Sequence, residues 1–383
     1  MSRPCVLFAG GGTGGHVFPA VAVAEAMQSM ADVDVAFCGT ARGVEARVVP
    51  ARGWRLELLD VLPITGGGPV RAVRGAFVAA RATASALLLV RRLRPAVVLS
   101  VGGYASGPVT LAAALQGVPV AVLEPNRVVG LANRLLAPFA RRAYVAWEEA
   151  GAPFRAGARR VYGVPLRAGF APKPYAPRGG IARVLVVGGS QGAEALNERV
   201  PPAMARLAHV AGLEVVHQAG RDRDAAVRVA YAKEGVARAT VTPFLDDVAR
   251  AVADADVVVA RAGASTLGEL TAVGRAAILV PYPHAAADHQ GQNAEALARA
   301  GGAVCIRQDD ATPERLAHEL EKLLRDDAAR VRMADASRAR GRPGAATDVA
   351  SDLLDLAGIA RRPRPSSTNG TTRGQRSAAQ EAH

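Results

Sequence analysis

Two glycine-rich turns, one in each half of the chain, carry residue types suited to binding phosphate groups. The first is Gly10-Gly11-Gly12-Thr13-Gly14-Gly15-His16 and the second is Gly188-Gly189-Ser190-Gln191-Gly192. Each follows a short apolar run, precedes a helix-like stretch and pairs its glycines with a hydroxyl residue, Thr13 or Ser190. A strand, a glycine turn and a helix expose backbone N–H groups at the helix N-terminus, where an anion is favoured. The repeated unit predicts two similar domains that face one cleft.

His16 directly follows the first turn, at the start of the expected helix. A histidine there often belongs to a core, but a turn at the carboxyl end of a strand opens into a cleft, so we expect a functional role. A helix N-terminus lowers the pKa of a histidine, which keeps the ring neutral and able to accept a proton.

The glycines also fit the dinucleotide fingerprint, although the next expected strand ends in Cys38-Gly39-Thr40 without an acid for the ribose.

The second half contains another polar helix start, Ala264-Ser265-Thr266-Leu267-Gly268-Glu269. Ser265 and Thr266 are placed to contact an anion there. Glu269 lies one turn further on, where a carboxylate accepts hydrogen bonds from the two hydroxyls of a ribose; a solvated helix acid is the alternative. These residues suit a sugar nucleotide whose leaving diphosphate is stabilised by the helix N-terminus.

Further polar residues follow other apolar runs. Gly102-Gly103-Tyr104 and Glu124-Pro125-Asn126 each come after an expected strand, so they face the same cleft. His284, Asp288 and His289 suggest a metal site as an alternative, but they do not amount to three strong ligands. We therefore expect neither a metal nor a cofactor.

Short apolar runs alternate with alanine-rich helical stretches, which predicts an α/β fold of two Rossmann-like, doubly wound domains. The expected strands are residues 5–8, 33–38, 96–100, 118–123, 143–146, 183–187, 213–217, 239–242, 256–260, 276–280 and 303–306. The expected domains are residues 1–164 and 182–343, joined by a Pro- and Gly-rich linker, 165–181. A helix at 344–358 and a polar tail, 359–383, expected to be disordered, follow.

The composition indicates a soluble globular protein: of 383 residues, half are hydrophobic and 21% are charged. The net charge of +13 fits either a solvated arginine-rich surface or an anionic partner. Aromatic residues make up only 4%, too few for base-stacking platforms, so we expect no nucleic acid partner. Cys5, Cys38 and Cys305 lie far apart and indicate buried thiols. No signal peptide or membrane-spanning segment is evident, so a cytoplasmic protein is expected.

In this order, the motifs resemble those of the MurG family of bacterial glycosyltransferases. The motifs that carry the resemblance are Gly11-Gly12-Thr13-Gly14-Gly15-His16, Gly102-Gly103-Tyr104-Ala105-Ser106-Gly107-Pro108, Gly188-Gly189-Ser190-Gln191-Gly192-Ala193, residues 264–269 and residues 281–290. The resemblance covers roughly residues 4–357. It implies the two-domain GT-B fold, whose last helix returns to the first domain. It also implies an inverting transfer of N-acetylglucosamine from UDP-GlcNAc to lipid I, the undecaprenyl-pyrophosphoryl-muramoyl-pentapeptide, which forms lipid II.

The resemblance further implies a role for each matching residue. Thr13, Gly14 and Gly15 would lie on the acceptor and donor-sugar side, Asn126 at the donor sugar, Arg167 and Ser190 near the nucleotide, and Leu245 beside the uracil. Ala264, Ser265, Thr266, Leu267, Gly268 and Glu269 would surround the diphosphate and ribose, and Gln290 would reach a GlcNAc hydroxyl. A base must accept the proton of the muramoyl 4-hydroxyl; His16 is the first candidate and Glu124 the second.

The sequence departs from the family pattern at three places. Leu123-Glu124-Pro125-Asn126 replaces the common His-Glu-Gln-Asn, Val164 replaces a polar residue, and Ala287 replaces an acid. Two rival interpretations remain. One is a related GT-B enzyme, such as a UDP-GlcNAc 2-epimerase or a natural-product glycosyltransferase. The other is a non-catalytic, membrane-associated scaffold that binds UDP-sugars.

Residues 69–94 form an expected amphipathic helix with a membrane-binding composition. Val73, Phe77 and Leu88 are among its apolar residues, and Arg71, Arg74, Arg81, Arg91 and Arg92 are among its basic ones. Such a helix binds anionic lipid at the interface, and the alternative is a core-packed helix with a charged outer face. A peripheral location on the cytoplasmic face of the cell membrane is the resulting expectation.

Overall fold

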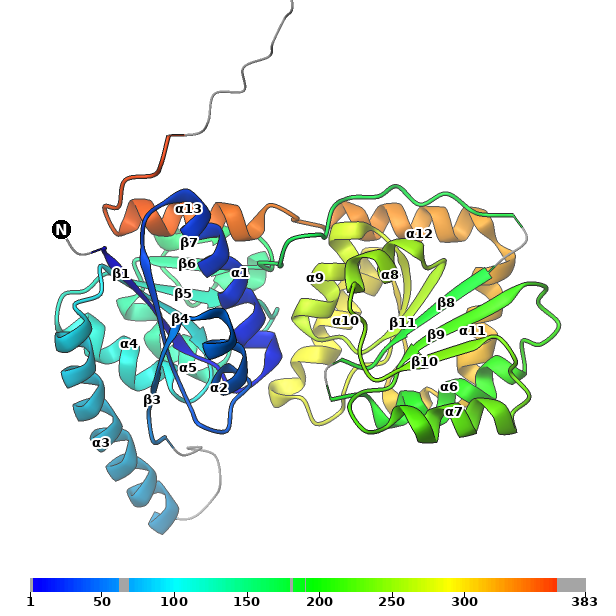
Figure 1. The fold of residues 1–383 in the computed structure, drawn as a ribbon, viewed down its shortest axis with the longest axis horizontal. Helices are drawn as coiled ribbons and strands as arrows, with labels where there is room; N and C mark the ends of the chain where they lie inside the picture. The colour runs from blue at the N-terminus through cyan, green and yellow to red at the C-terminus, as the bar shows by residue number, and fades with distance from the viewer. Residues whose placement is uncertain (1–2, 62–68, 180–181, 190, 364–383) are drawn as a thin grey trace, which may run out of the picture.

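The computed structural model describes residues 3–61, 69–179, 182–189 and 191–363, and for residues 69–80 only the backbone. It has two α/β domains, each built on a parallel sheet (Figure 1). The N-terminal sheet has the strand order β3-β2-β1-β4-β5-β6-β7, and the C-terminal sheet has the order β10-β9-β8-β11-β12-β13. This is the doubly wound arrangement predicted from the alternating apolar and helical stretches.

The strands of the N-terminal sheet are β1 (Cys5–Gly10), β2 (Asp34–Gly39), β3 (Arg55–Leu58), β4 (Val97–Gly102), β5 (Val120–Glu124), β6 (Arg142–Val145) and β7 (Arg159–Val161). Its helices are α1 (Gly14–Met30), α2 (Glu45–Val48), α3 (Pro69–Leu93), α4 (Ser106–Leu115) and α5 (Leu131–Leu136). All eleven predicted strands are present in the chain, and of the strands in the described residues the prediction missed β3 and β7.

The strands of the C-terminal sheet are β8 (Ala182–Val187), β9 (Leu213–Gln218), β10 (Ala239–Thr242), β11 (Val257–Ala260), β12 (Ala276–Leu279) and β13 (Val304–Cys305). Its helices are α6 (Glu194–Ala205), α7 (Asp224–Lys233), α8 (Val248–Asp254), α9 (Ala264–Val273), α10 (His289–Arg299), α11 (Pro313–Arg325) and α12 (Asp327–Ala339). The last helix, α13 (Ala345–Leu356), lies across the N-terminal domain (Figure 1).

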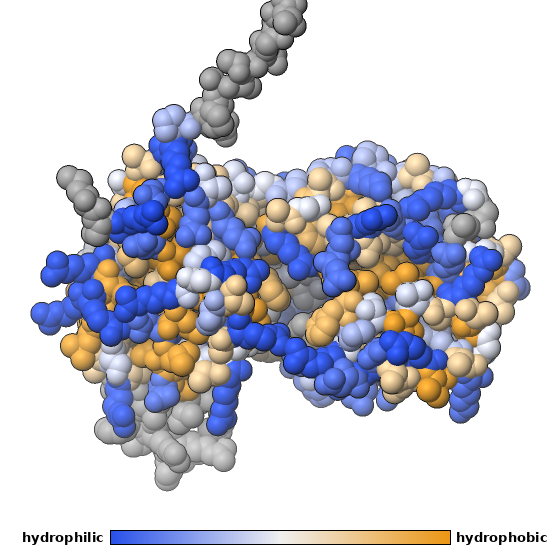
Figure 2. All heavy atoms as spheres, in the orientation of Figure 1, coloured by the Kyte–Doolittle hydropathy of each residue, from blue (hydrophilic) through white to orange (hydrophobic). Residues whose placement is uncertain are grey.

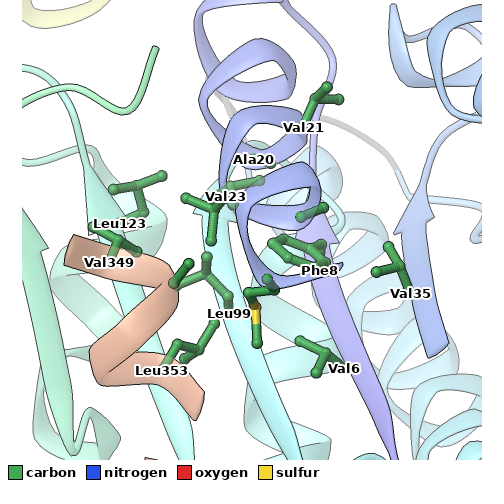
Figure 3. Packing of buried hydrophobic residues seen from close by; sticks show 14 of the residues in the cluster. Val6, Phe8, Ala20, Val21, Val23, Val35, Leu99, Leu123, Val349 and Leu353 are labelled. Atoms are coloured by element: carbon green, nitrogen blue, oxygen red, sulfur yellow. The ribbon is translucent and has the colours of Figure 1, made fainter. Parts of the chain in front are cut away.

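Helix α13 contributes to the N-terminal core. Val349 and Leu353 are fully buried, in one cluster with Phe8 of β1, Val23 of α1 and Leu99 of β4 (Figure 3). Such buried aliphatic and aromatic side chains each contribute about 1.5–3 kcal/mol through removal from water. Secondary structure formed by the end of the chain therefore stabilises the domain formed by its beginning.

The segment between the domains, residues 165–179, runs along the C-terminal domain and is anchored there by Tyr175. The Tyr175 hydroxyl donates to Asp256 Oδ1 (2.7 Å) and accepts from Arg330 Nε (2.8 Å). Its ring also lies beneath the guanidinium of Arg275. The chain therefore passes from one domain to the other just before this segment. At Gly163 the chain packs against the segment before α13, where it returns to the N-terminal domain. A Cβ on Gly163 would lie 2.5 Å from the Cβ of Arg342.

Several remaining features concern the surface and the chain ends. Among the described residues, no helix combines the length and the apolar character needed to cross a bilayer. Of the three cysteines, Cys38 is buried, but Cys5 and Cys305 are only partly buried, contrary to prediction. Residues 359–363 lie against the N-terminal domain, where Arg362 N–H donates to Met30 O (2.6 Å). The rest of the predicted tail, from residue 364, lies outside the described residues.

Candidate active site

His16 lies in the first turn of α1, with one ring nitrogen held by the glycine turn. Its Nδ1 is 3.2 Å from the carbonyl oxygen of Gly11 and 3.4 Å from Thr13 Oγ1. Because a carbonyl only accepts, Nδ1 carries the proton and Nε2 is left as the basic atom. Nε2 points at β4, where a Cβ on Gly102 would lie 3.2 Å from it. Burial lowers the pKa of His16, and the charge of Glu124 and the hydrogen bond to Gly11 only partly oppose that shift.

The first glycine turn has a backbone shape that only glycine adopts readily. Gly10, Gly11 and Gly12 have φ values of 122°, 150° and 90°. The turn packs against the end of β4, because Gly11 N–H donates to Gly102 O (3.0 Å). On its other side lies the buried carboxylate of Glu45, whose Oε2 accepts from Gly12 N–H (2.7 Å). A Cβ on Gly11 would lie 2.4 Å from that carboxyl group. The glycines are therefore needed for both φ and space.

Glu124, the second candidate base, ends β5 with its carboxylate enclosed by donors. Oε1 accepts from the backbone N–H (3.1 Å) and side-chain amide (3.2 Å) of Asn126. Oε2 accepts from Gly130 N–H (2.9 Å) and Asn133 Nδ2 (3.0 Å). The residue is 2% exposed. Four accepted hydrogen bonds use the usual capacity of a carboxylate, so Glu124 orients Asn126 and shapes the turn after β5.

On the opposite side of the cleft, α9 begins with Gly263 as its N-cap. No side chain caps this helix, so its first backbone N–H groups face outward from the helix end. Ser265 Oγ is buried and has no hydrogen-bond partner among the described residues. A buried hydroxyl without a partner costs free energy, and a ligand oxygen at the helix start would satisfy it.

Glu269 lies one turn further along α9 and faces Arg167. Arg167 Nη2 is 3.7 Å from Glu269 Oε1, and the Glu269 side chain is 18% exposed. Burial raises the pKa of Glu269 to about 7, and Arg167 pulls it down by less. A carboxylate so poorly hydrated gains strongly from new donors such as ribose hydroxyls.

The remaining predicted residues of the C-terminal domain lie around α9. Leu245 packs on the hydrophobic cluster that contains Ala264 and Leu267. Gln290, in the first turn of α10, accepts from Ala262 N–H (3.3 Å) and Tyr282 N–H (3.0 Å) through Oε1. Gly268 packs against the domain crossing, since a Cβ there would lie 3.0 Å from Val164 Cβ. Ser190 lies outside the described residues.

Helices from the two domains come together at the cleft. Helices α1 and α9 are in contact, and Thr13, Gly14 and Gly15 form the start of α1. His289 of α10 is close enough for its charge to act on the pKa of His16. The surface is hollowed between the two domains (Figure 2). The structure therefore brings His16 and Asn126 of the first half close to α10 of the second half.

A direct bridge between the domains is formed by Asn293 of α10. Its Oδ1 accepts from Arg127 N–H (2.9 Å) and its Nδ2 donates to Asn126 Oδ1 (3.2 Å). Beside it, a cavity of about 520 Å³ lies between the domains. Its lining includes Arg127 and Trp147 from one domain and Ala264, Leu267, Gly268 and Asn293 from the other.

The residues considered for a metal site have protein partners instead. Both carboxylate oxygens of Asp288 accept from Arg307 Nη1 (2.9 Å each). His289 Nδ1 donates to Ala286 O (2.8 Å), and the ring of His284 stands edge-on to that of Tyr282. Within the described ranges, no three His, Cys, Asp or Glu side chains are grouped to hold a metal ion.

Sequence reasoning missed two residues of this site, Asn293 and Glu45. Asn293 follows Gln290 by three positions, so the two lie on one face of α10, and this spacing was an available signal. Glu45 gives no comparable signal, because its partner Gly12 is 33 residues away in the sequence.

Comparison with known proteins places both halves in one family. Residues 6–145 match the glycosyltransferase family 28 N-terminal domain, and residues 183–349 match the glycosyltransferase family 28 C-terminal domain. A protein of Sorangium cellulosum is 57% identical, over 97% of this chain and 93% of its own length. Another, of Syntrophotalea carbinolica, is 45% identical, over 90% of this chain and 96% of its own. Both are named UDP-N-acetylglucosamine--N-acetylmuramyl-(pentapeptide) pyrophosphoryl-undecaprenol N-acetylglucosamine transferase. The crystal structure of Acinetobacter baumannii MurG superimposes with a TM-score of 0.76 at 33% identity, covering 92% of this chain and 99% of that one.

Proposed function

The chain belongs to glycosyltransferase family 28, and on that premise we propose how the interdomain cleft performs the family's reaction. The protein transfers N-acetylglucosamine from UDP-GlcNAc to undecaprenyl-pyrophosphoryl-MurNAc-pentapeptide, lipid I, and thereby forms lipid II for peptidoglycan. The fold is the two-domain GT-B arrangement. Each residue around the cleft takes its role from its position and its chemistry.

The observation that carries the assignment is the contact between α1 and α9, one helix from each domain. His16 lies in the first turn of α1, close enough to His289 at the start of α10 for the charge of His289 to act on its pKa. The reaction joins two substrates that each carry a diphosphate. Each helix start offers backbone N–H groups and the positive end of a helix dipole. We assign the α9 start, with its unpartnered Ser265 hydroxyl, to the diphosphate of UDP-GlcNAc. The α1 start and Thr13 then face the pyrophosphate of the lipid acceptor.

The nucleotide end of the donor lies along α9 in this assignment. Glu269 accepts hydrogen bonds from the two ribose hydroxyls, and Arg167 lies beside it. Leu245 supplies an apolar contact for the uracil. At the sugar end, the amides of Gln290 and Asn126 contact hydroxyls of the GlcNAc, one from each domain.

His16 is the base in this mechanism. The muramoyl 4-hydroxyl oxygen forms a bond to C1 of the donor sugar, while the bond between C1 and the diphosphate oxygen breaks. The hydroxyl proton moves to His16 Nε2, and UDP leaves from the opposite face with the bonding electron pair. The lowered pKa of His16 keeps Nε2 free at neutral pH. Glu124 is a positioning residue, since its carboxylate is occupied by four donors.

The lipid acceptor brings the enzyme to an anionic membrane surface on its cytoplasmic side, and we assign that contact to α3. In the described part of this helix, Ala86 and Leu89 are buried, while Leu88 is 69% exposed. Arg81 and Arg91 are exposed. The structure does not describe the side chains of Arg71, Val73, Arg74 and Phe77. Their contribution to membrane binding is therefore proposed from the sequence pattern.

The decisive experiment incubates the protein with labelled UDP-GlcNAc and a lipid I analogue and looks for labelled disaccharide lipid. Transfer by the wild type, and a fall of kcat by about two to four orders of magnitude in His16→Ala, are the expected results. Turnover of UDP-GlcNAc without an acceptor would instead indicate an epimerase. Binding of UDP-GlcNAc without any product would indicate a scaffold.

A further inference from the structure

The turn after β5 and the start of α9 belong to different domains, yet one buried side chain contacts both. Asn293 is fully buried on α10. Toward the N-terminal domain it accepts from Arg127 N–H (2.9 Å) and donates to Asn126 Oδ1 (3.2 Å). Toward its own domain, Nδ2 is 3.5 Å from Ala262 O, one residue before the N-cap of α9.

We propose that Asn293 is a positioning residue that holds the sugar-contacting amide of Asn126 in register with the start of α9. The inference rests on the proposed function, because Asn126 and α9 take their roles from it. Asn293 itself has no assigned contact with either substrate. It acts by fixing the position of one domain's substrate contact relative to the other domain's diphosphate site.

On the N-terminal side of this bridge, Asn126 and Arg127 are held in place by their own domain. Glu124 binds both the backbone and the amide of Asn126, so the Asn126 side chain has one orientation on its own domain. Arg127 is anchored as well, because its Nη2 is 3.1 Å from Glu149 Oε1. Asn293, by binding the turn at Asn126 and Arg127, is therefore linked to the N-terminal domain as a whole.

The C-terminal side of the bridge is equally fixed. The peptide groups on either side of Ala262 are bound by α10: its N–H donates to Gln290 and its C=O faces Asn293. The turn that leads into α10 contains Ala287 and Asp288 in the left-handed region, at φ values of 50° and 51°. Non-glycine residues adopt that conformation only where surrounding contacts impose it. The Asp288–Arg307 ion pair is one such contact.

The bridge has a definite geometric consequence. An asparagine presents an acceptor and two amide hydrogens, and here all three are directed at groups of the two domains. Opening of the cleft at this point separates Asn293 from Asn126 and Arg127 while its bond to Ala262 remains. The closed arrangement is then favoured by two hydrogen bonds that a hydrophobic side chain of similar size cannot make.

The test compares Asn293→Ala and Asn293→Leu with wild type; the leucine variant keeps the buried volume. Gln292→Ala is the matched control, because Gln292 is the neighbouring amide and its hydrogen bond among the described residues stays within its own domain, to Ala287 O. Three quantities are measured for each protein: kcat with a water-soluble lipid I analogue, the Kd of UDP, and the midpoint of thermal unfolding. UDP is the chosen probe because it lacks the sugar that Asn126 contacts.

The expected result is at least a tenfold loss of kcat in both Asn293 variants, with the Kd of UDP within threefold of wild type. Gln292→Ala should keep both values. In the double variant Asn126→Ala/Asn293→Ala, kcat should match that of the worse single variant within about threefold, because the two residues act through one contact. Small-angle scattering should show a larger radius of gyration for Asn293→Leu than for wild type.

Three results would overturn the proposal. Unchanged kcat in Asn293→Leu, losses that multiply in the double variant, or a Kd of UDP that rises as much as kcat falls would each exclude a role across the cleft. A destabilised but folded Asn293→Ala leaves Asn293→Leu and its scattering profile as the deciding measurements. Failure of the wild type to transfer sugar would refute the proposed function instead, and the scattering comparison would still test the bridge.

Discussion

Glu45 Oε2 accepts a 2.7 Å hydrogen bond from the backbone nitrogen of Gly12, across a sequence separation of 33 residues. The same carboxylate accepts from Thr40 through its backbone N–H (2.9 Å) and hydroxyl (3.1 Å). Glu45 is 1% exposed, so these donors replace its water. The buried carboxylate of Glu45 thus supports the glycine turn together with the turn's own glycines.

We therefore expect Glu45→Ala to destabilise the fold by about 3–5 kcal/mol, because it removes three hydrogen bonds to a charged group and leaves a cavity. Chemical denaturation measures the change in the free energy of unfolding. Glu198→Ala, at an exposed position of α6, is the control and should change it by less than about 0.5 kcal/mol. A cost for Glu45→Ala as small as the control's would show that the turn holds its shape without this carboxylate.

Glu269→Ala should weaken the binding of UDP-GlcNAc by about 2–4 kcal/mol, since hydrogen bonds to a charged group are worth about 1.5–3 kcal/mol each and two coupled ones do not add fully. Isothermal titration calorimetry measures the Kd directly. At pH 5, where the Glu269 carboxyl is protonated, the midpoint of thermal unfolding should stay close to that of wild type. An unchanged Kd would remove Glu269 from the ribose site.

The raised pKa of Glu269, about 7, makes donor binding pH-dependent. The ribose hydroxyls donate best to the charged carboxylate, so the affinity for UDP-GlcNAc should rise as the pH increases from 6 to 8. The donor's diphosphate is a diester and does not titrate in this range, so the protein group is responsible. Glu269→Gln should abolish the slope, and persistence of the slope in that variant would assign it to another group.

The same shift has a consequence for stability, with a definite sign. The folded-state pKa of Glu269 lies above the unfolded value of about 4.3. The folded form therefore binds the extra proton, and its contribution to stability is present at low pH and lost as the pH rises toward 7. Relative to wild type, Glu269→Gln should gain thermal stability between pH 5 and pH 8. An equal difference at both pH values would contradict the assignment.

Activity should not require a divalent ion. In the proposed mechanism, the helix start of α9 and its hydroxyl residues stabilise the leaving diphosphate, as a metal does in other transferases. Assays with excess EDTA should therefore retain most of the wild-type rate. Complete loss of transfer in EDTA, restored by Mg²⁺ or Mn²⁺, would refute this mechanism.

Replacing Arg71, Arg74 and Arg81 by glutamine should reduce binding to anionic vesicles about 100-fold at low salt. Each basic residue near such a surface contributes about 1 kcal/mol, and about 1.4 kcal/mol corresponds to a factor of ten. The control replaces Arg223, Arg238 and Arg332, exposed arginines of the C-terminal domain, and should leave cosedimentation unchanged. Turnover of a water-soluble acceptor should survive in both variants. Equal vesicle binding by the two variants would show that α3 does not contact the membrane.

Local patterns were sufficient to predict most of the fold. Strands buried on both faces, such as β1 and β11, are continuous apolar runs that the sequence displays directly. The two missed strands, β3 and β7, lie at the edges of their sheet, are short, and each begins with arginine. Their conformation is imposed by pairing with a neighbouring strand, which a local window does not contain.

The candidate site divides in the same way. The positions of residues that follow strands, such as His16 and Glu269, could be predicted because the ends of parallel strands lie at one edge of a sheet, whereas their roles stay predictions. The role of Glu124 could not, since it depends on donors that fold around it, Asn126 and Asn133. The proposed role of Asn293 could not be predicted either, because its hydrogen bonds to Arg127 and Asn126 depend on how the two domains are placed.

The position of α13 in the N-terminal core also sets an order of events during synthesis. The first domain to leave the ribosome lacks Val349 and Leu353 until nearly the whole chain has been translated. The C-terminal domain, by contrast, carries all of its strands and helices α6–α12 before α13 is made. The domain that is begun first is therefore finished last, and a chain released before residue 345 leaves the apolar surface of Phe8, Val23 and Leu99 without its cover.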